Sequence, residues 1–203
     1  MRTRFVVATI AFALSLGLAG AGEQQKPEHP APADPQKQAM MEAWMKASTP
    51  GDNHKLLEPM VGTFDAKVMM WEPGAAPAES AGVSENSWIL GGRFVQQKFN
   101  GTYMGMPFEG VGFTGYDNVK KKFIGSWMDS MGTMMMVSIG TGDVTGKVLT
   151  FECEMDDPMT GKPCKIREVA RVVDANKHVF EMFGPDPAGK EYKMMEITYT
   201  RKK

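Results

Sequence analysis

After Pro59 the chain is divided into short segments in which hydrophobic and polar residues alternate, separated by Gly, Asn, Asp and Pro. This pattern predicts antiparallel strands joined by tight turns. Closure of such a series removes its unpaired edges, so we expect an all-β fold: a single antiparallel up-and-down β-barrel of about ten strands over residues 59–203. The expected strands are Thr63–Trp71, Gly82–Leu90, Arg93–Gly101, Pro107–Tyr116, Lys121–Met128, Thr133–Thr141, Lys147–Met155, Cys164–Val173, His178–Phe183 and Glu191–Arg201.

The segment before the barrel, residues 37–58, has a helical pattern. Lys37–Ser48 contains no Gly or Pro, and Met41, Trp44 and Met45 recur at helical spacing. Pro50-Gly51 ends this helix. A second short helix is expected over Asp52–Leu57, with Asp52 as its N-cap.

The first 21 residues have the pattern of a signal peptide, with two arginines, an apolar run and a small-residue cleavage pattern. The Pro-rich residues 22–36 that follow read as a disordered tether. We therefore expect an exported protein, periplasmic or extracellular. No later apolar stretch is long enough to span a membrane.

The net charge of the chain limits the kinds of partner that it is expected to bind. The chain has 23 Lys and Arg against 24 Asp and Glu, and the signal peptide takes two of the arginines. A slightly acidic chain without a basic run argues against nucleic acid or an anionic membrane as partner. The lysines Lys120 to Lys122 are expected in a solvated turn.

Two cysteines, Cys153 and Cys164, are predicted to form a disulfide, because an even number in an exported protein favours a bridge. A hairpin turning about Pro158-Met159 would place them directly opposite each other on one face. The alternative is two buried reduced thiols.

The segment Ser126–Ser138 contains five methionines. Pairing the two strands so that Trp127 faces Met134 puts Met134 and Met136 on one face with Trp127, and Met128 and Met135 on the other. A Cu(I) site at Met134 and Met136 is one interpretation. We favour a pliant apolar wall, because the methionines do not share one face.

Alternation in the strand Cys164–Val173 puts Glu168 on the apolar face, with Arg167 and Arg171 on the other. Inside a barrel Glu168 needs a partner or a ligand. Arg93 is predicted to point inward as that partner, although such an ion pair can also be purely structural. Asp129 lies at a turn and is expected to be solvated.

Catalytic patterns are not found. None of the three histidines, His29, His54 and His178, lies beside a Ser or Cys nucleophile in a motif. His54 is expected to cap the barrel, and His178 to lie at a strand end. The glycines of "GVGFTG", Gly110–Gly115, are expected to bend the barrel.

Several motifs carry a family resemblance. The chain resembles the bacterial domain-of-unknown-function 1579 family, which has no settled biochemistry, over nearly all of His54–Lys203. The motifs are "GGRF" (91–94), "GYDNVKKKF" (115–123), "WMDSMGT" (127–133), "DDPMTGK" (156–162) and "GKEYKMMEITYTRK" (189–202).

More loosely, the chain is similar to calycins, the lipocalin-like and fatty-acid-binding-like barrels. These have a Gly-x-Trp on the first strand and an Arg on the last that stacks on the Trp. Gly62-Thr63-Phe64 and Arg201 stand in the matching places. Phe64 and Arg201 are therefore either a stacked pair or simply a core residue and a surface charge.

The function that these features favour is an exported binding module that holds a small, largely apolar ligand. No cofactor, metal ligand or oligomeric state is assigned. The alternatives are a Met-rich metal-handling protein and an enzyme with a barrel pocket. The expected ligand-binding residues are Trp88, Arg93, Trp127, Met134, Met136, Glu168 and Tyr199.

Overall fold

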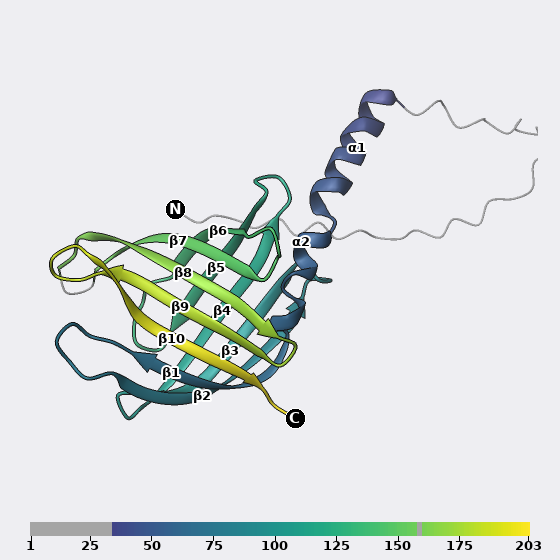
Figure 1. Cartoon of the computed structure of the whole chain (residues 1–203). Helices are drawn as coiled ribbons and strands as arrows, with labels where there is room; N and C mark the ends of the chain where they lie inside the picture. The colour runs from purple at the N-terminus through teal and green to yellow at the C-terminus, as the bar shows by residue number, and fades with distance from the viewer. Residues whose placement is uncertain (1–33, 158–159) are drawn as a thin grey trace, which may run out of the picture.

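The computed structural model describes residues 34–157 and 160–203, which form a closed β-barrel preceded by short helices (Figure 1). The helices are α1 (Pro35–Ser48), α2 (Asp52–Lys55) and the 3-10 helix η1 (Glu58–Met60). The strands are β1 (Gly62–Met70), β2 (Ala78–Ile89), β3 (Phe94–Tyr103), β4 (Met106–Asp117), β5 (Lys122–Asp129), β6 (Met136–Gly142), β7 (Val148–Asp156), β8 (Pro163–Asp174), β9 (Lys177–Pro185) and β10 (Glu191–Arg201).

Each strand pairs antiparallel with its neighbours in the sequence, and β1 pairs with β10 to close the barrel. The predicted fold class and all ten expected strands are confirmed, with boundaries shifted by a few residues. The expected helix over Lys37–Ser48 is also confirmed, although it begins at Pro35, inside the expected tether. The signal peptide, tether residues 22–33 and His29 lie outside the described residues.

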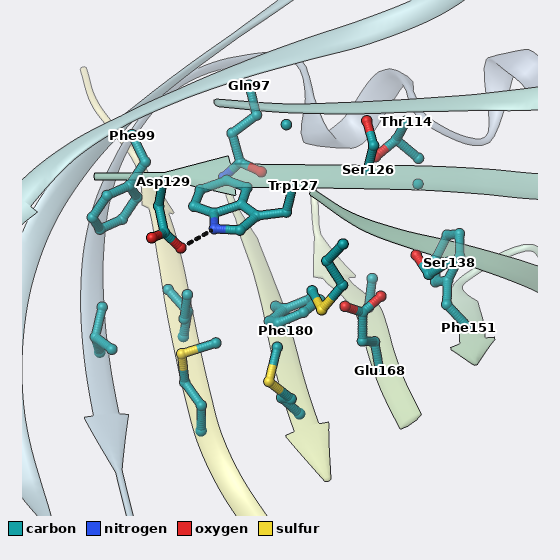
Figure 2. A pocket seen from close by; sticks show the side chains of 18 of the residues that line it. Gln97, Phe99, Thr114, Ser126, Trp127, Asp129, Ser138, Phe151, Glu168 and Phe180 are labelled. Atoms are coloured by element: carbon teal, nitrogen blue, oxygen red, sulfur yellow. Dashed lines mark hydrogen bonds between the residues drawn. The ribbon is translucent and has the colours of Figure 1, made fainter. Parts of the chain in front are cut away.

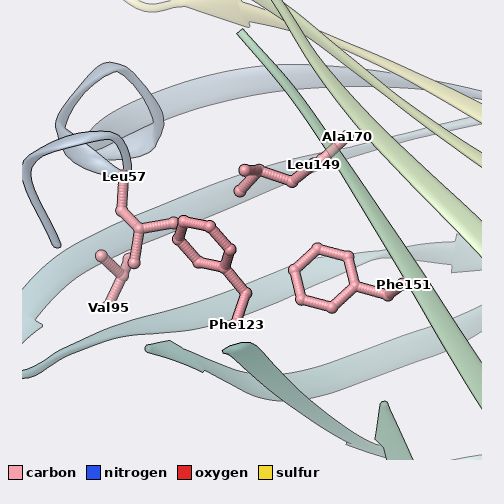
Figure 3. Packing of buried hydrophobic residues seen from close by; sticks show 6 residues of the cluster. All are labelled: Leu57, Val95, Phe123, Leu149, Phe151 and Ala170. Carbon is pink, nitrogen blue, oxygen red and sulfur yellow. The ribbon is translucent and has the colours of Figure 1, made fainter. Parts of the chain in front are cut away.

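One end of the barrel, called here the closed end, is covered by α2 and η1. Leu57, between the two helices, is fully buried against Phe123 and Leu149 of the barrel wall (Figure 3). His54 is buried beside it, and its Nδ1 accepts a hydrogen bond from the backbone N–H of Gly51 at 3.0 Å. His54 therefore helps to close the barrel as predicted. The N-cap of α2 is Gly51, so the prediction of Asp52 as the cap is wrong.

Arg201 ties the closed end to the last strand. Its guanidinium lies 4.6 Å from the centre of the Phe64 ring and donates hydrogen bonds to the carbonyls of Val61, Pro59 and Ala175. The stacked alternative for Phe64 and Arg201 is therefore the correct one. Gly62 has a φ of +131°, and a Cβ there would lie 2.2 Å from Arg201 Nη1, so this position requires glycine.

Helix α1 extends away from the barrel (Figure 1). None of its residues is buried, and Met41, Trp44 and Met45 are exposed. Its C-terminal end is held by Asn118, whose Nδ2 donates to the carbonyls of Ala47 and Thr49. Lys120 and Lys121, in the same turn as Asn118, and Lys122, the first residue of β5, are all exposed.

Two hairpin registers differ from the predicted ones. Trp127 faces Met136 rather than Met134, because β6 begins at Met136 after a longer loop. This shift of two residues leaves every side chain on its predicted face.

Cys153 faces Ile166, and Cys164 faces Met155, so the predicted direct opposition of the two cysteines is wrong. The hairpin closes through the N–H of Asp157, which donates to the carbonyl of Lys162 at 2.8 Å. The expected turn centre, residues 158–159, lies outside the described residues. Both thiols are free in this structure, so the predicted bridge is not formed. Burial raises the pKa of Cys153 to about 11, with smaller contributions from Glu168 and Cys164.

Candidate functional site

The barrel encloses a cavity of about 540 Å³. It extends from Leu57 and Met60 at the closed end to Met131 and Met134 in the β5–β6 loop, at the end called here the mouth. Met131 and Met134 are exposed, so the cavity reaches the surface there. Volumes of this order are typical of small-molecule sites.

Methionines form much of the cavity wall. The lining methionines are Met60, Met70, Met131, Met134, Met136, Met155, Met182, Met194 and Met195. Met194 and Met195 both line it although they are consecutive, because the β9–β10 register shifts between Lys193 and Met195. Met194 Sδ would lie 2.4 Å from a Cβ at Gly184, so it packs directly on this glycine. Methionine adapts its shape, which makes this wall suitable for ligands of varied outline.

Trp127 lies flat against the β4 backbone. A Cβ at Gly110 would lie 2.2 Å from the indole, and one at Gly112 would lie 2.9 Å from it. These glycines therefore make room for a ring, and the expectation that they bend the barrel stays a prediction. The indole N–H donates to Asp129 Oδ2 at 2.9 Å (Figure 2).

Asp129 is fixed at the mouth. Its second oxygen accepts a hydrogen bond from the N–H of Met131 at 2.9 Å. The residue is half-buried and lines the cavity. Asp129 lies at the end of β5, as expected, but it is half-buried rather than solvated, because it accepts hydrogen bonds from the Trp127 indole and the Met131 N–H.

Glu168 projects into the cavity from the middle of β8 (Figure 2). The residue is only 5% exposed. Burial raises the pKa of its carboxyl, and a hydrogen bond with Ser138 opposes the shift in part. The predicted inward direction of Glu168 is confirmed. Its predicted partner is wrong, because Arg93 lies exposed in the β2–β3 turn and donates to the carbonyl of Leu90.

A chain of hydrogen bonds follows the inner wall from the closed end. Asn86 donates to the carbonyl of Met60 and accepts from the Ser84 hydroxyl at 2.7 Å. Gln97 Nε2 donates to Ser84 Oγ at 2.9 Å and to Tyr199 Oη at 3.1 Å. Burial raises the pKa of Tyr199 to about 12, so its phenol is neutral at physiological pH. These polar groups stand in fixed positions beside the apolar wall.

His178 stacks on Tyr199, with 4.4 Å between the ring centres, and meets the edge of Phe64 at 4.6 Å. Burial lowers its pKa to about 4, with a further contribution from the charge of Arg201. Its Nδ1 is buried, and no partner for it lies among the described residues. His178 is therefore a neutral imidazole at the inner end of the cavity, as well as a strand-end residue.

The structure brings five of the seven predicted ligand-binding residues to the cavity: Trp127, Met134, Met136, Glu168 and Tyr199. Trp88 and Arg93 do not line it. Trp88 faces inward but lies at the closed end, where its indole N–H donates to Glu58 Oε2 at 2.7 Å. Sequence reasoning missed that η1 covers this position.

Other lining residues were not predicted. Gln97 and Phe99 share the inward parity of Val95, so alternation along β3 contained the signal for them. Phe180 and His178 share parity along β9 in the same way. Alternation along β10 does not predict that Met194 lines the cavity, because the register shift between Lys193 and Met195 changes which residues face inward.

No helix within residues 34–157 and 160–203 is both long and apolar enough to cross a membrane.

Comparisons with known proteins agree with this architecture. The crystal structure of Rv2717c from M. tuberculosis is similar, with a TM-score of 0.58 at 15% identity over 76% of this chain and 100% of that one, which shows the fold alone. A redesigned β-barrel matches with a TM-score of 0.37 at 16% identity over 77% of this chain and 100% of that one, too weakly to support an argument. A search of curated proteins found no match. The model of the family described as "Protein of unknown function (DUF1579)" matches residues 49–201, most of the chain, and the chain therefore belongs to the DUF1579 family.

Proposed function

We propose that this protein binds one small, largely apolar molecule inside the barrel. The observation that carries the proposal is the cavity of about 540 Å³, walled by methionine and aromatic side chains in a barrel whose far end is closed by Leu57. Ten strands with large inward residues could have filled this space with their own side chains. Glycines at positions 110, 112 and 125 have no side chains, so part of the wall projects less into the barrel.

The lining has the composition of a binding site rather than of a core. Most of it is apolar, and a few polar groups, among them Gln97, Tyr199 and Glu168, are positioned by hydrogen bonds or strand geometry. Such an arrangement gives affinity through apolar burial and orientation through the polar contacts. The expected contacts are Trp127, Met134, Met136, Glu168 and Tyr199.

Binding can be tested with a neutral fluorescent probe, N-phenyl-1-naphthylamine. We expect saturable binding of one probe per chain, with a change in Trp127 emission. Thr114→Trp places a large ring in the cavity and should abolish binding. Thr141→Trp, on the exposed outer face of β6, is the matched control and should bind normally. Equal binding by both variants would contradict the proposal.

We also propose that the ligand is met outside the cytoplasm, because residues 1–21 have the pattern of a signal peptide. Mass spectrometry of the protein from its own host should find a chain that begins near Gly22. Native mass spectra of the same sample would reveal a ligand retained during purification. A chain that keeps its first 21 residues would contradict export.

A further inference from the structure

The charged residues that line the cavity are all acidic. Among the lining residues that the structure describes, Glu168 and Asp129 are the carboxyls, and there is no Lys or Arg. His178 adds no positive charge, because burial lowers its pKa to about 4. Tyr199 adds no charge, because its pKa is about 12. Every ionisable group that can carry charge in the cavity at neutral pH is thus an acid.

The mouth of the cavity also carries more acidic than basic residues. In the loops at this end and the strand residues that flank them, the lysines are Lys162 and Lys190. The acidic residues are more numerous: Glu72, Asp129, Asp156, Asp157 and Asp186. Glu191 also lies here but is ion-paired with Arg167, and Lys193, over the ring of Trp71, is paired with Glu181 and Glu196. The net negative field at the entrance favours the approach of cations and opposes that of anions.

Glu168 has unused capacity to accept hydrogen bonds. A carboxylate has about four lone-pair sites, and Ser138 is the hydrogen-bond partner found for Glu168 among the described residues. None of the ion pairs of the described chain includes it. A buried carboxylate in this state is costly unless a cation or a strong donor is brought to it.

We infer that the ligand is an apolar molecule bearing an amine, whose protonated nitrogen lies beside Glu168, and that the cavity rejects fatty-acid carboxylates. This inference rests on the proposed binding function and specifies its ligand class. An ammonium donates to the free lone pairs of Glu168, and the electron-rich face of Trp127 on the wall attracts cations. A ligand carboxylate would instead bring a further negative charge into a low-dielectric space that already holds two acids.

Three ligands with the same ten-carbon chain separate the head groups: decylamine, decanol and decanoate. Each is titrated at pH 7.4 against bound N-phenyl-1-naphthylamine, below the concentration at which micelles form. We expect decylamine to bind more tightly than decanol, and decanol more tightly than decanoate. The amine should exceed the acid by about tenfold or more, as a charge-assisted hydrogen bond implies.

Glu168→Gln removes the charge and keeps the shape. It should weaken decylamine about tenfold, leave decanol nearly unchanged and strengthen decanoate. Glu152→Gln, on the exposed outer face of β7, changes net charge equally and should leave the ranking unchanged. Asp129→Asn, which keeps an acceptor for Trp127, should weaken decylamine to a smaller extent, because Asp129 lies nearer the solvent.

The outcomes are distinguishable. If decanoate binds as tightly as decylamine, or if Glu168→Gln leaves decylamine unchanged, the amine inference is wrong while the binding function stands. If neither the probe nor any of the three ligands binds, the binding function fails, and the inference fails with it. The ranking in the unmodified protein decides the matter even where a variant does not fold.

Discussion

The Arg201 guanidinium lies over the ring of Phe64, its direct partner across the β1–β10 pair, at 4.6 Å from the ring centre. The same guanidinium donates to three backbone carbonyls, two of them in the segment that closes the barrel end. One side chain thus joins the last strand, the first strand and the cap. Gly62 supplies the space that this arrangement needs.

Arg201→Ala should lower the free energy of unfolding by about 3 kcal/mol, because it removes a cation–π contact and charge-assisted hydrogen bonds. Arg201→Lys should recover only part of the loss, since an ammonium cannot reproduce the planar fork. Arg171→Ala is the matched control. Its ion pair with Glu181 is long, at 3.7 Å, and the Arg171 side chain is half exposed, so a change within about 0.5 kcal/mol is expected. Urea unfolding measures all three, and equal effects of the two alanine variants would contradict the assignment.

Leu57 carries the closure of the barrel end. It is 0% exposed and contacts the cluster of Phe123 and Leu149. Leu57→Ala should destabilise the protein by about 2–5 kcal/mol, the usual range for a fully buried leucine. Leu90→Ala, at a position 68% exposed in a loop of the same barrel end, should have little effect. Thermal unfolding of the two variants compares them, and similar midpoints would mean that Leu57 does not act as a plug.

His178 makes stability depend on pH. Its pKa falls from an ordinary 6.5 to about 4 in the folded protein, so between these values the unfolded chain binds the extra proton. Stability is therefore full above pH 6.5 and is lost as pH falls toward 4, by about 3 kcal/mol from this group. The groups that face the imidazole are the rings of Phe64 and Tyr199 and the charge of Arg201.

His178→Phe cannot titrate and should lack this contribution. Between pH 7 and pH 4.5 the unmodified protein should therefore lose about 2–3 kcal/mol more unfolding free energy than the variant does. His178→Gln, a second neutral replacement, should show the same shift even if its overall stability differs. Urea unfolding at several pH values measures this. A difference independent of pH would show that the pKa of His178 is the same in the folded and the unfolded chain.

The barrel could be predicted because its signals are local. Alternation and turn residues determine where each strand lies and which face of it turns inward, and Glu168 and Met136 were placed on the correct face for this reason. The pairing register of two strands depends on the length and conformation of the loop between them, and these are harder to predict from the sequence. Loops longer than expected moved the partners of Trp127 and Cys153 by two residues each.

The site was predictable only in part, because some of its boundaries come from distant segments. Trp88 has inward parity, but η1 covers it through the hydrogen bond to Glu58. Alternation predicts that Arg93 points inward only if Arg93 belongs to the strand. β3 begins one residue later, at Phe94. The Met194 register shift is likewise a tertiary feature, whereas Asp129 is held locally by Trp127 and Met131, each two residues away.

The fit between Trp127 and Gly110 gives the last prediction. Gly110→Ala would place a methyl group 2.2 Å from the indole, so the ring must move, its hydrogen bond to Asp129 must break and the cavity wall must change shape. Overpacking of this kind costs about 1–3 kcal/mol. Trp127→Phe removes the clashing atoms and should relieve much of that cost, so the two substitutions together should be less destabilising than the sum of their separate effects.

Gly51→Ala is the control for this cycle, because a Cβ at Gly51 would meet nothing within 4 Å. Combined with Trp127→Phe it should give additive changes, since the two sites share no contact. Unfolding free energies and indole emission of Gly110→Ala provide the readouts. Additive effects of Gly110→Ala and Trp127→Phe, with unchanged emission in the former, would mean that the indole does not rest on Gly110. The smaller projection of the wall that we propose for the ligand would then need another origin, because this contact is what holds the Trp127 ring flat against β4.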